Sequence, residues 1–301
     1  MAKYDMNRFC KLTVTALILT GMFVAHVCAA ASHDSRDVNV LYAGSLVNLM
    51  ERSIGPAFEK ASGLRFMGYA AGSNRIAGEI RGELRRGDVF ISASPTVNES
   101  LMGPTHGNAV SWYIRFASSP LLLGYHPQSR FAADFRMKRW DSVLREPGIR
   151  IGRTDPKLDP KGALTIALVT KAAALYHQPD LVRKTLGEPE NPAQVFPEEA
   201  LVGRLQSGQL DAGFFYATET SELNIPAVHP VPELNIQASY TLTILNDAPN
   251  ASGAARFVNF LLGAQGRALL AAHGVHVTRP VVTGDARAIP PSVRATLNAV
   301  P

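Results

Sequence analysis

The chain has 301 residues, with 30 Lys and Arg against 25 Asp and Glu, and 46% of its residues are hydrophobic. A chain of this length can bury a large apolar core without help from disulfides. Because the basic excess is small and basic residues are interleaved with acidic ones, the composition argues against a nucleic-acid-binding surface.

Residues 1–31 have the pattern of an export signal. A basic start is followed by the apolar run 12–27 and then by small residues suited to signal peptidase. We expect cleavage within Ala29–Ser32 and a mature protein in the periplasm. Both cysteines, Cys10 and Cys28, fall in this leader, so the mature chain has no cysteine-ligated metal site and no thiol nucleophile.

After the leader, apolar residues alternate between strand-like and helix-like spacing. A strand is predicted over 37–43, followed by a helix over 45–61 with apolar residues at steps of three and four. A strand over 64–70, a helix over 73–87 and a strand over 88–92 continue the pattern. This succession predicts parallel pairing with helical crossovers, and in such sheets ligands bind beyond the carboxyl ends of the strands.

Two Gly-Ser pairs stand where a predicted strand turns into a helix. Ser45 follows Gly44 after the first strand, and Ser73 begins the second helix. A helix start presents unpaired backbone N–H groups, glycine lets a ligand approach the backbone, and serine adds a hydroxyl donor. Two such corners can hold one small anion. The alternative is that both serines serve only as helix N-caps, a role in which serine is common.

The rest of the chain repeats this pattern with different spacing. Extended segments are predicted within 112–125, interrupted at 118–120. Later strands are predicted over 149–152, 210–217 and 240–245, and helices over 131–144, 163–176, 179–186, 197–208, 251–262 and 265–273. The tail from Arg279 contains several prolines and is expected to wrap over the surface. We therefore predict an α/β protein of two lobes, 36–118 with 240–301 and 119–239, with a ligand cleft between them and two crossovers that serve as a hinge.

Five motifs carry a resemblance to a known family: VLYAGSL, AAGS, GDVFISA, DPKG and LQSGQLDAGFFY. In order and spacing they resemble the molybdate/tungstate-binding proteins of ABC importers, especially the archaeal-type group and its bacterial relatives. The similarity extends from about Val38 to His273. It implies a type II periplasmic binding-protein fold that delivers a tetrahedral oxyanion to an inner-membrane permease. No enzymatic activity and no cofactor are implied, and we expect a monomer.

The resemblance also implies a set of ligand residues: Gly44, Ser45, Ser73, Asp159, Glu198 and Tyr216. Carboxylates near a dianion repel it unless they approach its central atom. Mo(VI) and W(VI) can expand from four oxygen neighbours towards six, so Asp159 and Glu198 are expected to contact the metal atom of the oxyanion. Sulfur and phosphorus cannot expand in this way, which gives selectivity. Glu199 follows Glu198 directly and leaves the choice between them open, and Lys161 is expected to face solvent.

Other functions stay open at this point. A sulfate- or phosphate-binding protein is the alternative if the two carboxylates do not reach the site. An iron(III)-binding protein is a weaker alternative, because related iron-binding proteins use several tyrosines and Tyr216 is the one tyrosine at the predicted cleft edge. A periplasmic hydrolase is least favoured, since the sequence contains neither a His-Glu-x-x-His motif nor a Gly-x-Ser-x-Gly elbow. The sequence does not predict which of molybdate and tungstate is preferred, because the two anions have nearly the same size and charge.

Overall fold

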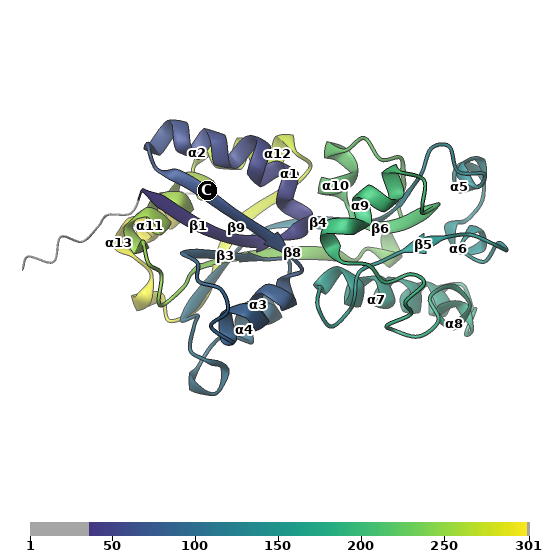
Figure 1. The fold of residues 1–301 in the computed structure, drawn as a ribbon, viewed down its shortest axis with the longest axis horizontal. Coiled ribbons are helices and arrows are strands. Elements are labelled where there is room, and N and C mark those ends of the chain that lie inside the picture. Colours follow the sequence, from purple (N-terminus) through teal and green to yellow (C-terminus); the bar gives the residue numbers. More distant parts are fainter. Residues whose placement is uncertain (1–35, 300–301) are drawn as a thin grey trace, which may run out of the picture. The chain divides into compact units, whose positions relative to one another are not determined.

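The computed structural model of the chain describes residues 36–299 (Figure 1), so the predicted leader lies outside the described residues. The described residues belong to one compact unit. Its strands are β1 (Asp37–Ala43), β2 (Arg65–Ala71), β3 (Val89–Ser92), β4 (Trp112–Tyr125), β5 (Ile151–Gly152), β6 (Ala212–Tyr216), β7 (Ala227–Val228), β8 (Gln237–Ile244) and β9 (His276–Gly284). They form one sheet in the order β2-β1-β3-β8-β4-β6-β5, and β7 and β9 also pair with β4.

Helices cover both sides of this sheet. They are α1 (Val47–Leu49), α2 (Gly55–Ser62), α3 (Ser73–Arg81), α4 (Pro95–Glu99), α5 (Ala132–Met137), α6 (Trp140–Val143), α7 (Pro160–Leu175), α8 (Leu181–Thr185), α9 (Glu198–Gln206), α10 (Ala217–Glu222), α11 (Ala251–Leu262), α12 (Ala264–Ala272) and α13 (Pro291–Ala299). No helix in the described part of the chain has the length and apolar character needed to cross a membrane.

The predicted parallel pairing of the first three strands is confirmed. β1 pairs in parallel with both β2 and β3. Val40 and Tyr42 face a core that includes Phe58 of α2, whereas Leu41 faces a second core that includes Ile76 of α3. Figure 1 shows α2 on one side of these strands and α3 and α4 on the other. Both faces are therefore buried, as parallel sheets require.

β4 is one long strand whose partner changes along its length. Its residues Ile114–Pro120 pair with β8, and Leu121–Tyr125 pair with β6, both in antiparallel fashion. The predicted interruption at 118–120 is therefore wrong as a break in the strand. It marks instead the place where the pairing partner changes. The lobe boundaries near 118 and 239 stay a prediction.

Two other expectations are corrected. The helix predicted to reach residue 87 ends at Arg81, and Glu83 has a positive φ of 54°. The tail from Arg279 was expected to wrap over the surface, with no strand predicted in it, but 276–284 forms the largely exposed strand β9, which pairs with β4. The sequence did not predict β9 because the strand contains Pro280, and proline, which has no N–H to donate to a β ladder, argues against a strand. Pro280 falls where the pairing shifts register, between Val277 and Val281.

Candidate functional site

The predicted ligand residues all stand where a strand ends or a helix begins. Gly44 and Ser45 follow β1, and Ser73 is the first residue of α3. Asp159 is the N-cap of α7, Glu198 is the first residue of α9, and Tyr216 ends β6. The carboxyl-edge placement expected from the strand and helix succession thus holds in both parts of the sheet.

The glycines of the two Gly-Ser pairs lie against the two carboxylate residues. A Cβ atom on Gly44 would collide with Cγ of Glu198, and one on Gly72 would lie 3.1 Å from Cβ of Asp159. The N–H of Arg75 donates to the carbonyl of Leu158 at 3.0 Å beside the second contact. Segments more than eighty residues apart in the chain are therefore packed into one site.

Both predicted serines are buried and keep hydrogen-bonding capacity. Oγ of Ser73 accepts the N–H of Ala93 at 3.1 Å, which leaves its hydroxyl hydrogen able to donate. Oγ of Ser45 lies 3.0 Å from the hydroxyl of Tyr240. Both contacts orient a hydroxyl at a helix start, where a bound anion would also meet the positive end of the helix dipole.

Each predicted carboxylate uses one oxygen within the protein. Oδ1 of Asp159 accepts the N–H of Lys161 at 2.7 Å, and Oε1 of Glu198 accepts from Nζ of Lys161 at 2.8 Å. Oε2 of Glu198 is buried and has no hydrogen-bond partner among the described residues. The half-exposed carboxylate of Glu199 pairs with Arg75 at 3.2 Å. Glu198 is thus the buried one of the two adjacent glutamates, and its choice over Glu199 as a ligand residue stays a prediction.

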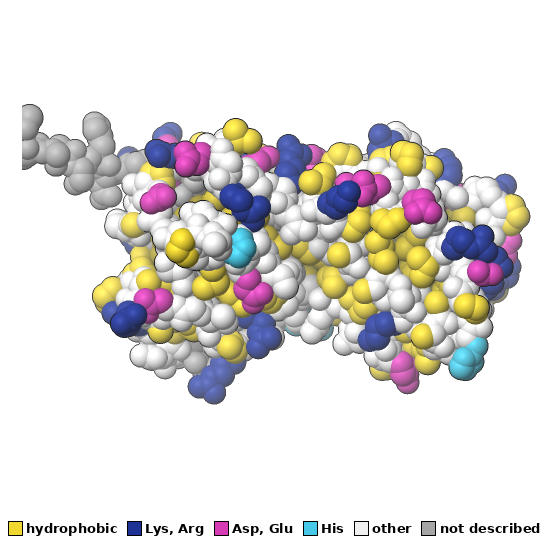
Figure 2. All heavy atoms as spheres, turned by 90° about the horizontal axis from the view of Figure 1, so that it is seen from below, with side chains coloured by type: hydrophobic (Ala, Val, Ile, Leu, Met, Phe, Trp, Pro, Cys, Tyr) yellow, Lys and Arg dark blue, Asp and Glu magenta, His cyan; other side chains and the backbone are white. Residues whose placement is uncertain are grey.

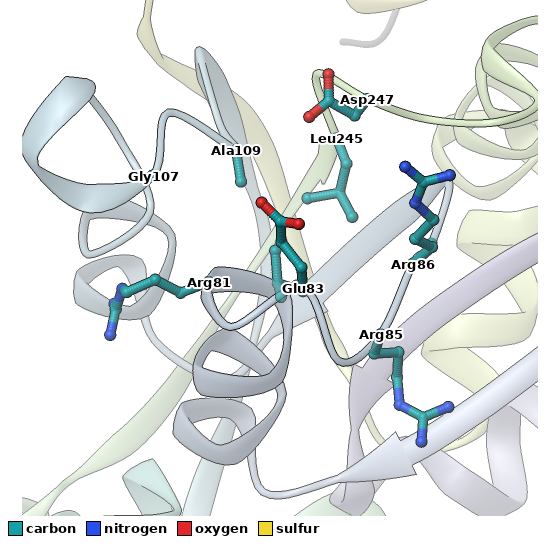
Figure 3. Close-up of a pocket in the computed structure, with 10 residues that line it drawn as sticks. Arg81, Glu83, Arg85, Arg86, Gly107, Ala109, Leu245 and Asp247 are labelled. Carbon is teal, nitrogen blue, oxygen red and sulfur yellow. The ribbon is translucent and has the colours of Figure 1, made fainter.

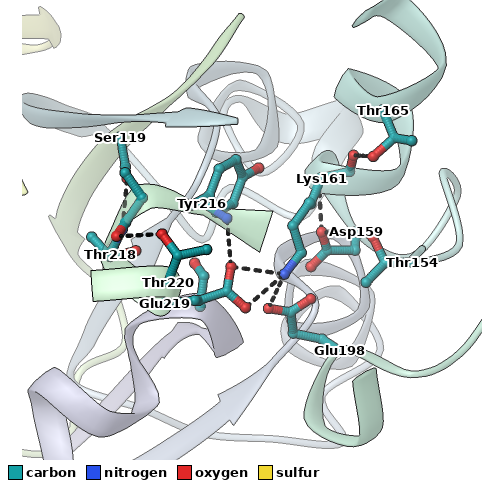
Figure 4. A network of polar contacts seen from close by, with 12 residues as sticks. Ser119, Thr154, Asp159, Lys161, Thr165, Glu198, Tyr216, Thr218, Glu219 and Thr220 are labelled. Carbon is teal, nitrogen blue, oxygen red and sulfur yellow. Dashed lines mark hydrogen bonds and ion pairs between the residues drawn. The ribbon is translucent and has the colours of Figure 1, made fainter. Parts of the chain in front are cut away.

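Lys161 was expected to face solvent, and that expectation is wrong. Its side chain is 0% exposed, and its ammonium lies between the carboxylates of Glu198 and Glu219 (Figure 4). Nζ contacts the two oxygens of Glu219 at 2.9 and 3.0 Å. Lys161 stands two residues after the N-cap residue Asp159. Its side chain extends toward the buried carboxylates of Glu198 and Glu219 and not toward solvent.

Glu219 and Tyr240 belong to the cluster but were missed from the sequence. Oε2 of Glu219 accepts the N–H of Tyr216 at 2.8 Å, which ties Glu219 to the end of β6. The one available signal was a glutamate three residues after Tyr216, a position where it can accept from the backbone at a helix start. Tyr240 contacts the ring of Tyr216 and the hydroxyl of Ser45. It does so because its strand, β8, lies between β3 and β4 in the middle of the sheet.

Burial controls the protonation of this cluster. Desolvation, reinforced by the Glu198 charge, raises the pKa of Asp159 to about 7. Desolvation also raises the pKa of Glu219 to about 8, although the Lys161 ammonium opposes it. Burial alone would lower the pKa of Lys161, but the surrounding carboxylates outweigh it and raise the pKa, so Lys161 stays charged.

The two tyrosines of the site remain protonated donors. Their rings lie edge to face with centroids 6.3 Å apart. Burial raises the pKa of both Tyr216 and Tyr240 above the usual range. The hydroxyl of Tyr216 is buried without a hydrogen-bond partner in residues 36–299. The Tyr216 hydroxyl can therefore donate to a ligand that accepts a hydrogen bond.

A pocket of ≈ 210 Å³ reaches the carboxylates from outside; its lining includes Gly72, Arg75, Asp159 and Glu198. A second pocket of ≈ 200 Å³ lies at the end of α3 (Figure 3) and includes Arg81, Arg85 and Arg86. Glu83 and Asp247 share that second lining and offset its charge, and Arg85 pairs with Glu79. Of these two pockets, the one at Asp159 and Glu198 includes predicted ligand residues. Glu199 also lines it, whereas Gly44, Ser45, Ser73 and Tyr216 are not among its lining residues.

The family described as bacterial extracellular solute-binding protein matches residues 38–276. The chain belongs to this family. The solute-binding protein is 30% identical over 270 residues to an uncharacterized solute-binding protein of Petrotoga mobilis, covering 79% of this chain and 83% of the relative. It is 23% identical to the molybdate/tungstate-binding protein WtpA of Thermococcus kodakarensis, covering 91% of this chain and 93% of WtpA.

A solved structure confirms the predicted fold class. The periplasmic molybdate-binding protein of Azotobacter vinelandii matches with a TM-score of 0.63 at 18% identity, over 80% of this chain and 99% of that one. The solute-binding protein therefore has the α/β periplasmic binding-protein fold. The assignment of ligand contacts to its site residues stays a prediction for binding measurements.

Proposed function

We propose that this solute-binding protein captures molybdate or tungstate in the periplasm and delivers it to an ABC permease. In this proposal its signal peptide is cleaved, and the protein acts as a monomer without a cofactor and without turnover. Two relatives have names that support the ligand: WtpA, named above, and a putative ABC transporter molybdenum-binding protein of Haloferax volcanii that is 28% identical over 217 residues.

One observation carries the proposal: two buried polar atoms of predicted ligand residues lack partners among the described residues. They are the hydroxyl of Tyr216 and Oε2 of Glu198. A buried polar group without a partner costs about 1–3 kcal/mol, so such groups indicate a site that is completed by a ligand. A phenol can donate to an oxyanion. A carboxylate oxygen cannot; it fits a ligand whose central atom accepts another oxygen, or one that carries its own O–H donor, as hydrogen phosphate does.

The proposed capture uses both kinds of group. The hydroxyls of Ser45, Ser73 and Tyr216 donate to the oxygens of the anion. The second oxygens of Asp159 and Glu198 approach the metal atom, which sulfate and phosphate do not offer. Lobe closure around the ligand, expected from the two crossovers, would then present one bound conformation to the permease.

The surface agrees with a small ligand rather than a polyanion. Figure 2 shows Lys and Arg side chains interspersed with Asp and Glu over the face drawn. That face presents no continuous basic patch of the kind that nucleic acids require.

Calorimetric titration of residues 32–301 with molybdate, tungstate, sulfate and phosphate tests the function. We expect one-to-one binding of the first two anions and no binding of the last two. Binding of sulfate or phosphate with equal affinity would overturn the role given to the carboxylates. The variant D159N/E198Q retains the shapes of both side chains, and we expect it to lose preference for molybdate over sulfate. Full selectivity in that variant would show that the carboxylates do not contact the metal.

A hydrolase is favoured by one feature, a Ser-His-Glu arrangement outside the site. Oγ of Ser53 lies 2.9 Å from Nε2 of His273, whose Nδ1 lies 3.0 Å from Oε1 of Glu222. That oxygen nevertheless accepts no hydrogen bond within the described residues, so the orienting bond of a catalytic triad is missing. Ester hydrolysis that is lost in H273A would contradict the proposed absence of turnover.

A further inference from the structure

Lys161 contacts both carboxylates that are proposed to approach the metal atom. Its backbone N–H donates to Oδ1 of Asp159 at 2.7 Å, and its ammonium donates to Oε1 of Glu198 at 2.8 Å. The other contacts of Nζ go to Glu219 at 2.9 and 3.0 Å. An ammonium has three donors, and all of them have acceptors in the protein. Lys161 is therefore placed to orient ligand residues rather than to bind the anion itself.

These contacts determine which carboxylate oxygen points toward the ligand. Because Lys161 holds Oε1, Glu198 is left with Oε2, the buried atom that has no partner in the described residues. Without the lysine, the Glu198 carboxylate would lose its one hydrogen bond and its fixed orientation. A carboxylate that approaches a metal atom needs that orientation, since supporting hydrogen bonds fix the geometry of metal ligands.

Glu219 extends the same framework to Tyr216. Its Oε2 accepts the backbone N–H of Tyr216 at 2.8 Å while both of its oxygens contact Nζ of Lys161 (Figure 4). The side chains of Lys161, Glu198 and Glu219 are 0%, 2% and 5% exposed, so water does not screen these interactions. The buried ion pair thus holds two residues proposed to contact the ligand, Glu198 through Lys161 and Tyr216 through Glu219, while Asp159 is held by the backbone N–H of Lys161.

We propose that Lys161 and Glu219 are positioning residues that set the selectivity of this site for oxyanions whose central atom can accept a carboxylate oxygen. The inference rests on the proposed function and adds residues to which no ligand contact has been assigned. The ordinary alternative is that the pair only stabilises the fold by joining α7 to α10. A buried ion pair can often be replaced with little loss of stability, so binding and stability measurements separate the two roles.

The test compares K161M/E219Q with the wild type by calorimetric titration with molybdate and with sulfate, alongside thermal unfolding. The double variant replaces both members of the pair, so neither an ammonium nor a carboxyl is left without its partner at positions 161 and 219. We expect a folded protein that binds molybdate about 10- to 100-fold more weakly and whose preference for molybdate over sulfate is reduced. A folded double variant with wild-type affinity and preference would overturn the inference.

The matched control is R150M. Arg150 pairs with Asp211 at 2.9 Å where β5 and β6 begin, whereas Tyr216 stands where β6 ends, so the substitution removes an ion pair from the same part of the sheet. We expect lower stability and unchanged molybdate affinity. An equal loss of affinity in R150M would show that any weakened ion pair reduces binding, and the positioning role would be rejected.

Two further measurements separate failure of this inference from misfolding of the double variant and from failure of the proposed function. If K161M/E219Q does not fold, E219Q replaces it, because glutamine still offers an acceptor to the N–H of Tyr216. We then expect a smaller loss of molybdate affinity and a measurable fall in preference, and unchanged preference would overturn the inference. If the wild type binds neither molybdate nor tungstate, the proposed function itself fails and the inference fails with it.

Discussion

At the scale of single residues, the site depends on close approach between backbone and side chain. Gly44 has no positive φ, so glycine is not needed there for its backbone angles. It is needed because a Cβ atom would collide with Cγ of Glu198. The same glycine therefore lets the first part of the sheet meet a residue proposed to contact the metal atom.

G44A tests this contact. Overpacking of a buried contact costs about 1–3 kcal/mol, which corresponds to about 5- to 150-fold in molybdate affinity if the strain falls on the bound state. The control is G203A on α9, where an added Cβ has no neighbour within 4 Å. We expect G203A to raise stability slightly through helix propensity and to leave affinity unchanged. Wild-type affinity in G44A, measured by titration, would show that Gly44 and Glu198 do not stay in contact in the bound protein.

At the scale of elements, the position of Glu198 depends on the loop 187–196 between α8 and α9. The guanidinium of Arg153 is fully buried and donates to the carbonyls of Glu188 and Pro189 at 2.7 and 2.6 Å. The backbone of Arg153 also exchanges hydrogen bonds with Gln194 and Phe196. One residue at the end of β5 thus fixes the loop that leads into α9.

We expect R153M to loosen that loop. The same guanidinium donates to the carbonyl of the buried residue Leu186 at 3.4 Å. A buried acceptor left without a donor costs about 1–3 kcal/mol, so the free energy of unfolding should fall by about that amount. Amide hydrogen exchange should accelerate in 187–196, and molybdate affinity should fall because Glu198 is less well placed. R183M is the control, since Arg183 is an exposed partner of Asp180 on α8 and should change neither quantity measurably. Unchanged exchange in R153M would refute this role.

At the scale of the whole molecule, Glu222 joins helices that belong to distant parts of the chain. It ends α10, and its carboxylate lies 3.0 Å from His273 at the end of α12. Burial raises the pKa of Glu222 to about 7, while the charge of Arg52 opposes the shift. The folded protein therefore binds a proton at Glu222 more tightly than the unfolded chain, in which the pKa is close to 4.5.

The sign of the resulting pH dependence follows from linkage. A carboxyl whose pKa is raised by folding adds stability below its unfolded pKa and loses it as pH rises through the folded value. The free energy of unfolding of the wild type relative to E222Q should rise by up to about 3 kcal/mol as pH falls from about 8 to about 4.5. In the control D285N the difference should stay nearly constant over this range, because Arg287 lowers the pKa of Asp285 from 3.8 and the carboxyl stays charged in both the folded and the unfolded chain. Denaturant titrations across this pH range measure both, and a flat difference for E222Q would refute the assignment.

Patterns that are local in the chain could be predicted well. The strand β1, its parallel pairing with β2 and β3, and the helix start at Ser73 follow from apolar spacing and from glycine and serine at the corners. The helix predicted from residue 197 begins at Glu198, with Pro197 as its N-cap. The ligand set came from the family resemblance and stays a prediction, although the structure packs Gly44 against Glu198 and Gly72 against Asp159.

By itself, then, the sequence determined the fold class and which residues meet at the edge of the sheet. The tertiary structure decided where Lys161 points, that Glu219 and Tyr240 join the site, and that 276–284 is a strand. The physical reason is the distance along the chain between the partners. Lys161 contacts Glu198 and Glu219 at separations of 37 and 58 residues, and Ser45 contacts Tyr240 at a separation of 195. Local periodicity carries no information about such partners, and only the packed sheet brings them within hydrogen-bond distance.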